Sequence, residues 1–155
     1  MVHARGLSLQ RRSQLGAEPV DAQVLLGDSM GEMFAYYAAC DCAFIGGSLL
    51  PLGGQNLIEA LSCGKLVFVG PHTFNFAQIT KDAVQSGIAV RISDANELFS
   101  QWLAWLIDRD KLQEVSASAA QLTHVHRGAT EKTVRLLSGM LHQLQVNLVR
   151  ESGKF

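Results

Sequence analysis

The chain of 155 residues is 48% hydrophobic and 17% charged, which predicts one globular domain with a packed core and argues against disorder. Its formal net charge is -1, with acidic and basic residues interspersed, so we expect no nucleic-acid binding through a broad basic face. No apolar run reaches the ~18–20 residues needed to span a bilayer, and no signal peptide is recognisable. We therefore expect a soluble domain over residues 1–155, with no membrane association of its own.

The chain up to Ile92 alternates short apolar runs with amphipathic stretches, joined by glycine-rich turns. The apolar runs predict strands over 7–10, 24–26, 43–45, 66–69 and 88–92. The amphipathic stretches predict helices over 30–39, 56–63 and 75–85. Asp28 or Ser29 would cap the first of these helices. Strands that alternate with helices of this length predict an α/β fold, a Rossmann-like parallel sheet with helices on both faces.

After Ile92 the pattern is helical only. We expect Asp94 to cap a helix that runs through Ile107. Its apolar stripe is assigned to the core rather than to a cofactor site, and consists of Leu98, Trp102, Trp105 and Leu106. Two more helices are predicted, over 108–127 and 130–149.

The three cysteines, Cys40, Cys42 and Cys63, are an odd and sparse set that fits a reduced cytoplasmic setting better than a disulfide framework. Zinc sites usually have at least two residues between paired cysteines, together with a second pair of ligands. Cys40 and Cys42 are closer than that, with Cys40 at the end of a helix and Cys42 at the start of a strand. We therefore predict small buried side chains and no metal site.

Three loops follow predicted strands and precede predicted helices, over residues 27–32, 46–56 and 70–76. In an open parallel sheet, ligands bind outside the carboxyl ends of the strands, where such loops gather. The second loop carries four glycines, whose backbone N–H groups can approach an anion closely, and the helix after it adds its positive end. It has no P-loop lysine and does not match G-x-G-x-x-G, so no dinucleotide fingerprint is present.

For single residues near these loops, an ordinary structural role has to be weighed against a role in binding. Glu59, early in the helix after the second loop, can accept hydrogen bonds from a ribose diol or can cap its own helix, and spacing does not decide between these. His72 and Asn75 in the third loop are by spacing a loop histidine and a helix cap, and Glu32 is by default a solvated first-turn acid. The spacing reveals no Ser-His-Asp set and no carboxylate pair, so we assign no catalytic residue to the chain.

The three loops together resemble one known family. Gly-Asp-Ser-Met-Gly-Glu at 27–32 is similar to its GD(T/S)MGE signature, and residues 44–49 with 53–59 are similar to its VGGSL and GGHNxxE run. Gly-Pro-His-Thr-Phe-Asn-Phe at 70–76 matches its GPHTFNF element, and Arg-Arg-Ser at 11–13 also resembles the family. The resemblance covers roughly residues 11 to 140 and points to the 3-deoxy-D-manno-oct-2-ulosonic acid (Kdo) transferases, glycosyltransferases of the two-domain GT-B type.

The resemblance implies that residues 1–155 form the C-terminal half of a GT-B fold, which binds the donor CMP-Kdo without a metal or other cofactor. The family acts on a lipid A precursor at the cytoplasmic face of the inner membrane, and its catalytic glutamate lies in the N-terminal domain. The chain alone is therefore expected to bind donor without transferring Kdo. Carried over position by position, the donor-binding residues are Ser29, Met30, Gly31, Glu32, Gly47, Ser48, Gly53, Gly54, Gln55, Asn56, Glu59, His72 and Asn75.

The chain departs from the family pattern in two loop residues and at its start. Leu52 stands where family members commonly carry a basic residue, which leaves more of the donor's charge to backbone amides. Gln55 replaces a histidine and can donate a hydrogen bond but cannot carry a proton. Compared with the family, the chain starts after the opening strands of this domain, so we expect an incomplete sheet whose exposed edge favours self-association.

Two other functions remain open from the sequence. One is another GT-B transferase or an epimerase that uses a UDP-sugar, because glycine loops and a ribose carboxylate serve uridine and cytidine alike. The other is a non-catalytic interaction module with a degenerate pocket, which the changes at Leu52 and Gln55 would fit.

Overall fold

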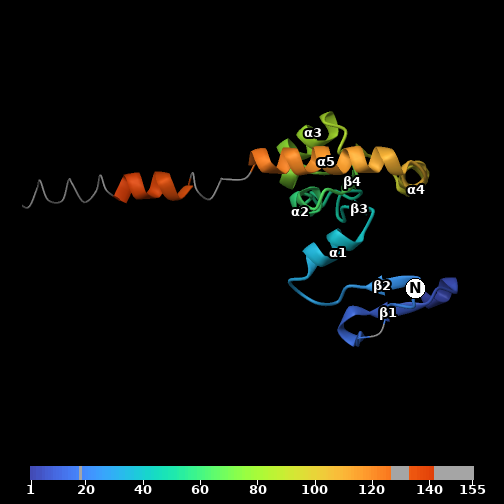
Figure 1. Cartoon of the computed structure of the whole chain (residues 1–155). Helices are drawn as coiled ribbons and strands as arrows, with labels where there is room; N and C mark the ends of the chain where they lie inside the picture. Colours follow the sequence, from blue (N-terminus) through green and yellow to red (C-terminus); the bar gives the residue numbers. More distant parts are fainter. Residues whose placement is uncertain (18, 127–132, 142–155) are drawn as a thin grey trace, which may run out of the picture. The chain divides into compact units, whose positions relative to one another are not determined.

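The structure, a computed structural model, describes residues 1–17, 19–126 and 133–141. It consists of two compact units, Met1–Cys40 (unit 1) and Asp41–Phe155 (unit 2), which are described one at a time (Figure 1). Each unit holds parallel strands together with helices, so the predicted α/β class is confirmed. Within the described ranges, the strands are divided between two sheets, two strands in unit 1 and three in unit 2.

Unit 1 contains a two-stranded parallel sheet and one α-helix. In chain order its elements are η1 (His3–Arg5), β1 (Leu9–Arg11), η2 (Arg12–Gln14), β2 (Val24–Leu26) and α1 (Met33–Ala39). β2 has the predicted bounds, and β1 begins two residues later than predicted, at Leu9 rather than Leu7. The α-helix begins at Met33 rather than Met30 because Gly31, at φ 81°, has a left-handed backbone that cannot continue a helix.

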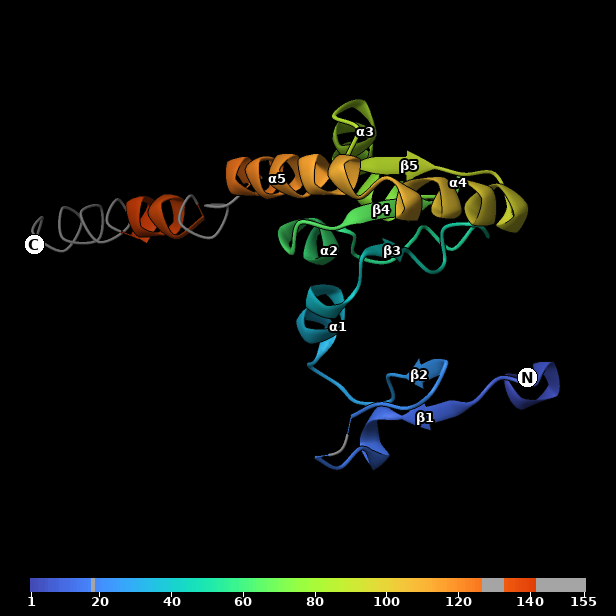
Figure 2. The same cartoon turned by 45° about the vertical axis from the view of Figure 1, so that its right-hand side comes forward.

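Unit 2 contains a three-stranded parallel sheet, formed by β3 (Cys42–Phe44), β4 (Leu66–Val69) and β5 (Ala89–Arg91). β4 lies in the middle, with Phe44 opposite Phe68 on one side and Arg91 opposite Val69 on the other (Figure 2). All four residues of β4 are buried, as expected of a central parallel strand that is covered on both faces. Because the strands are parallel, the loops that leave β3 and β4 emerge at the same edge of the sheet.

Helices flank this sheet, and their bounds are α2 (Ile58–Ser62), α3 (Ala77–Gln85), α4 (Ala95–Ile107) and α5 (Arg109–His126). α2 and α5 contact β4, and α3 contacts β5. Trp102 of α4 stacks on Phe68 of β4, with ring centroids 6.1 Å apart. The predicted stripe of α4 thus covers the core from its edge rather than lying inside it, because none of its residues is fully buried. The Asp94 cap is also confirmed, since its carboxylate accepts from the backbone N–H groups of Asn96 and Glu97 at 2.7 and 2.9 Å.

Other boundaries differ from the prediction by short stretches. The predicted helix over 75–85 opens with a 3₁₀ turn, η3 (Phe74–Phe76), before α3, and α2 is shorter than the predicted 56–63. Residues 133–141 are helical, and the rest of the predicted helix over 130–149 lies outside the described residues. The three cysteines, all among the described residues, form no disulfide bond. Cys42 is buried at the start of β3 as predicted, whereas Cys40 and Cys63 are half-buried. Within the described ranges, no helix combines the length and the apolar character that a membrane crossing requires.

Candidate functional site

The loops after β3 and β4, residues 46–56 and 70–76, are bonded to each other at the carboxyl edge of the unit 2 sheet. The backbone N–H of His72 donates to the carbonyl of Ser48 at 2.9 Å, and that of Asn75 donates to the carbonyl of Gly53 at 3.2 Å. These residues are more than twenty positions apart along the chain. The structure thus joins the second and third predicted loops into one cluster, called the loop cluster below.

Two glycines make this close approach possible. A Cβ on Gly70 would lie 2.3 Å from the carbonyl oxygen of Ser48, a backbone atom that cannot swing away. A Cβ on Gly53 would lie 2.4 Å from Nδ2 of Asn75, and the residue also has φ +88°. A side chain at Gly70 would force the two loops apart, whereas one at Gly53 would displace the Asn75 and Phe74 side chains and strain the backbone.

Ser48 lies at the centre of the loop cluster and is fully buried. Its hydroxyl donates to the carbonyl of Ile45 and accepts from the backbone N–H of Gly70, at 2.9 Å in the second case. This satisfies a buried hydroxyl, which would otherwise carry a desolvation cost. The hydroxyl therefore joins β3 to the start of the third loop, and the role of Ser48 as a donor contact stays a prediction.

The second loop, residues 46–56, is called the glycine loop below, and it also has hydrogen bonds within itself. The backbone N–H groups of Gly54 and Gln55 donate to the carbonyls of Gly47 and Gly46, both at 3.1 Å. These two amides shape the loop, so the predicted contact between loop amides and an anion depends on the other amides of the segment. α2 contains five residues, which makes the contribution of its dipole smaller than the longer predicted helix would supply.

Asn56 and Glu59 form a bonded pair at the start of α2. The Asn56 side-chain oxygen accepts from the backbone N–H of Ile58 at 3.0 Å, and its Nδ2 donates to Oε1 of Glu59 at 3.0 Å. The Glu59 carboxylate is half-buried and bonds a side-chain amide rather than a backbone N–H. Asn56 thus bonds the first residue of α2, and the Glu59 carboxylate is held beside the end of the glycine loop.

The remaining predicted site residues of unit 2 differ in exposure. His72 is half-buried, whereas Gln55 and Asn75 are exposed. The Asn75 side chain nevertheless donates weakly to the carbonyls of Leu52 and Gly54, at 3.4 Å each, and so braces the glycine loop. Leu52 itself is 65% exposed, an apolar side chain on the surface of the loop cluster.

The first predicted loop, residues 27–32, belongs to unit 1. Glu32 accepts a hydrogen bond from Arg12 at 2.7 Å and another from the hydroxyl of Ser29, which also lies 3.1 Å from the hydroxyl of Tyr36. The Ser29 hydroxyl is the main cause that lowers the pKa of Glu32, and Arg12 adds to it while desolvation opposes both. Glu32 is therefore a bonded carboxylate rather than a merely solvated acid. Met30 is almost fully exposed.

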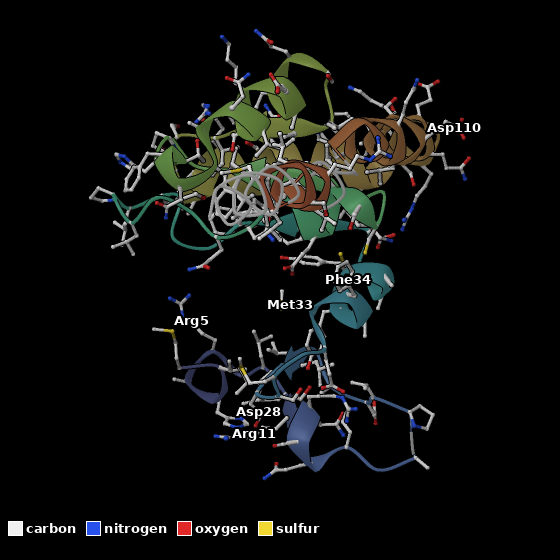
Figure 3. All side chains as sticks on the ribbon, turned by 90° about the vertical axis from the view of Figure 1, so that its left-hand side faces the viewer. Arg5, Arg11, Asp28, Met33, Phe34 and Asp110 are labelled. Atoms are coloured by element: carbon white, nitrogen blue, oxygen red, sulfur yellow. The ribbon has the colours of Figure 1, made fainter. Side chains whose placement is uncertain are left out.

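Asp28 is bonded to the segment after β1. Its carboxylate accepts from the backbone N–H of Ser13 at 2.9 Å and from the Ser13 hydroxyl at 2.8 Å, and Arg11 lies 3.7 Å away (Figure 3). The backbone bond from Ser13 is the first cause of a lowered pKa for Asp28. The prediction that Asp28 or Ser29 caps α1 was wrong, because Asp28 bonds Ser13, Ser29 bonds the side chains of Glu32 and Tyr36, and the helix has no side-chain cap.

The structure thus places the predicted site residues in two sets. Ser29, Met30, Gly31 and Glu32 lie in unit 1, and the others lie in unit 2. Sequence reasoning missed Arg91, which ends β5 and bonds the loop after β4. A lone arginine belongs to no motif. The sequence feature that could have indicated Arg91 is its position at the carboxyl end of a predicted strand. Among the described residues, no group of three histidine, cysteine, aspartate or glutamate side chains could hold a metal ion.

Comparison with known proteins supplies the family. A 3-deoxy-D-manno-octulosonic acid transferase of Bordetella pertussis is 45% identical over 141 residues, which is 90% of this chain. A second such transferase, from Haemophilus influenzae, is 34% identical over 134 residues, or 86% of the chain. This chain is a homologue of the Kdo transferases. It spans 33% and 31% of the lengths of these two relatives.

The fold of this Kdo transferase homologue is similar to a solved structure. The crystal structure of the C-terminal CMP-Kdo binding domain of WaaA from Acinetobacter baumannii matches with a TM-score of 0.71 and 32% sequence identity. The match covers 77% of this chain and 63% of that domain chain. No protein-family model matches the sequence. The resemblance inferred from the three loops is therefore confirmed, both in sequence and in fold.

Proposed function

We propose that this chain binds CMP-Kdo as the donor-binding part of a GT-B glycosyltransferase, a Kdo transferase. The observation that carries the proposal is the likeness to a solved CMP-Kdo binding domain, at a TM-score of 0.71 and 32% identity. We propose the following residues as donor contacts, none of them catalytic: Ser29, Met30, Gly31, Glu32, Gly47, Ser48, Gly53, Gly54, Gln55, Asn56, Glu59, His72 and Asn75.

The loop cluster supports this proposal because hydrogen bonds within the protein fix its backbone. The hydrogen bonds from His72 and Asn75 hold the third loop on the glycine loop, and Ser48 fastens both to the strand edge. Loops that are already fixed need little ordering when a ligand binds, which removes part of the entropic cost of binding. Gly46 is exposed and Gly47 half-buried, so a phosphate or a sugar can approach the backbone there, whereas Gly53 and Gly54 are buried.

A more specific proposal concerns the reaction of the complete enzyme. We propose that the complete activity is transfer of Kdo from CMP-Kdo to a lipid A precursor at the cytoplasmic face of the inner membrane, without a metal ion. The names of the relatives from Bordetella pertussis and Haemophilus influenzae support the transferase part of it.

Calorimetric titration of the purified 155-residue chain with CMP, UMP and ADP tests the donor class. We expect saturable binding of CMP, with UMP and ADP bound more weakly. A preference for UMP would instead favour a donor domain for UDP-sugars. Absence of binding for all three nucleotides would favour the interaction-module hypothesis and would contradict the proposal.

Glu59 gives a residue-level test of the same site. If its carboxylate accepts hydrogen bonds from the ribose, Glu59→Gln keeps the shape of the side chain but loses charge-assisted acceptance. Bonds to charged groups contribute about 1.5–3 kcal/mol, so CMP affinity should fall about tenfold to a hundredfold. The melting temperature should change little, because a first-turn Glu→Gln costs a few tenths of a kcal/mol in dipole interaction, roughly.

Glu114→Gln is the matched control for this variant, since Glu114 is an exposed helical glutamate on α5. It should leave CMP affinity unchanged. A Glu59→Gln protein with wild-type affinity and a lowered melting temperature would assign Glu59 to the fold of α2 and remove it from the donor site.

A further inference from the structure

Arg91 is tied to the loop that follows the neighbouring strand. It ends β5, directly opposite Val69, the last residue of β4. Its guanidinium donates from NH1 to the carbonyls of Gly70 and Pro71 at 2.9 and 3.2 Å, and from NH2 to the hydroxyl of Thr73 at 3.4 Å. One side chain therefore bonds three of the first four residues of the third loop.

The same loop holds the glycine loop in place. The backbone N–H of His72, between two of the residues that Arg91 bonds, donates to the carbonyl of Ser48. Asn75 follows and donates to Gly53 from its backbone, and to Leu52 and Gly54 from its side chain. Hydrogen bonds thus connect Arg91 to the third loop, and further hydrogen bonds connect that loop to the glycines of the proposed donor site.

Arg91 also brings the charge that these loops lack. Residues 46–56 and 70–76 contain no lysine, arginine, aspartate or glutamate. A guanidinium bonded to the carbonyls of the third loop places a positive charge on the loop cluster. A nucleoside monophosphate is an anion, so this charge has the sign that favours its binding.

Arginine suits this place better than lysine. Its rigid, planar fork presents several N–H donors at once, whereas lysine has one ammonium group on a flexible stem. The fork serves the two neighbouring carbonyls from one nitrogen and the Thr73 hydroxyl from the other, a spread that a single ammonium nitrogen does not offer. We propose that Arg91 is a positioning residue of the donor site, which holds the third loop so that the glycine loop keeps its nucleotide-binding shape. This inference rests on the proposed CMP-Kdo function.

The test compares Arg91→Lys and Arg91→Met with Arg109→Met in the 155-residue chain. Arg109 is a matched control because it is an exposed arginine of unit 2 whose bond goes to Asp41, away from the loop cluster. Two measurements are made on each protein: CMP affinity by calorimetry, and the amide NMR signals of Gly53, Gly54 and Asn75 without ligand.

Arg91→Met should weaken CMP binding about five- to tenfold, as expected when several bonds to a charged group are lost, and should shift the three loop signals. Arg91→Lys should recover part of the affinity, because it keeps the charge but not the fork. Arg109→Met should change neither measurement.

Three outcomes would overturn the inference. The first is an Arg91→Met protein that is less stable but keeps wild-type affinity and unmoved loop signals. The second is an Arg91→Lys protein that matches the wild type in both measurements. The third is an Arg109→Met protein that loses as much affinity as Arg91→Met. If the wild type itself binds no CMP, the proposed function fails. Shifted loop signals in ligand-free Arg91→Met would still support positioning, and unshifted signals would end it.

Discussion

Units 1 and 2 both contain parallel strands, but different interactions stabilise the strands in each unit. In unit 2, β4 is buried along its whole length, and Phe68, Leu61 and Ile88 are fully enclosed. In unit 1, no described residue is buried, and both residues Leu25 and Leu26 of β2 are exposed. Its segments are joined instead by polar side chains, most clearly Arg12 with Glu32 and Ser13 with Asp28.

The comparison shows two ways of fixing a loop at the end of a strand. The unit 2 loops are anchored on a hydrophobic core, whose packing resists changes in pH and salt. The unit 1 loop that contains Ser29 and Glu32 is held by carboxylates that must be ionised and by a half-buried ion pair that salt partly screens. Core substitutions should therefore act on unit 2, and protonation should act on unit 1.

The largest effect is expected from Phe68→Ala. Phe68 is fully buried in β4 and stacks on Trp102, so its removal leaves a cavity that costs about 3–5 kcal/mol of unfolding free energy. Phe34→Ala is the counterpart in unit 1, where the side chain is 58% exposed, and should cost less than about 0.5 kcal/mol. Chemical denaturation of both variants gives the two values. Similar losses for Phe34 and Phe68 would remove the contrast between the units.

A smaller effect is expected from Gly70→Ala, which sharpens the comparison within unit 2. The new Cβ would meet the carbonyl of Ser48 at 2.3 Å, and relieving this overlap should cost about 1–3 kcal/mol. It should also lower CMP affinity, because the loops of the proposed site must separate. Gly46→Ala is the control, since nothing lies within 4 Å of its Cβ position. Equal destabilisation by both substitutions would show that the close approach at Gly70 is unimportant.

The smallest effect is expected from a fall in pH, which should weaken the hydrogen bonds of unit 1. The pKa values of Asp28 and Glu32 are lowered below their ordinary 3.8 and 4.5 by the bonds from Ser13, Ser29 and Arg12. A carboxylate with a lowered pKa in the fold stabilises it above the unfolded-state pKa, and this contribution is lost as the pH falls through the lowered value. Acidification below those ordinary values should therefore release the Ser13 amide while the amides of β4 stay protected, as NMR-detected hydrogen exchange can follow.

Ser13→Ala provides the control for the acid experiment. It removes one of the two Ser13 donors to Asp28 and keeps the backbone one, so the pKa of Asp28 should move up toward its ordinary value. Carboxyl carbon shifts report this pKa directly. A titration of Asp28 that is the same in both proteins would mean that the Ser13 hydroxyl does not stabilise its charge.

Features that depend on neighbouring residues could be predicted from the sequence. β2 and β4 have the predicted bounds because their apolar runs are bounded by glycines and polar residues, and Asp94 caps α4 because its carboxylate reaches amides two and three residues on. The family followed from three loop motifs, which lie in short segments at the ends of strands. The start of α1 was misplaced because Gly31 has a left-handed backbone, and because Asp28 bonds Ser13 and Ser29 bonds the Glu32 side chain instead of capping the helix.

Features that depend on residues far apart were decided by tertiary structure alone. Ser48 and Gly70 are separated by 22 positions and Arg91 and Gly70 by 21, yet each pair shares a hydrogen bond across the strand edge. Strand periodicity shows which face of a strand is apolar, but not which strand lies beside it. The division of the described strands into two sheets, the burial of Ser48 and the attachment of Arg91 to the third loop all arise from that choice of neighbours.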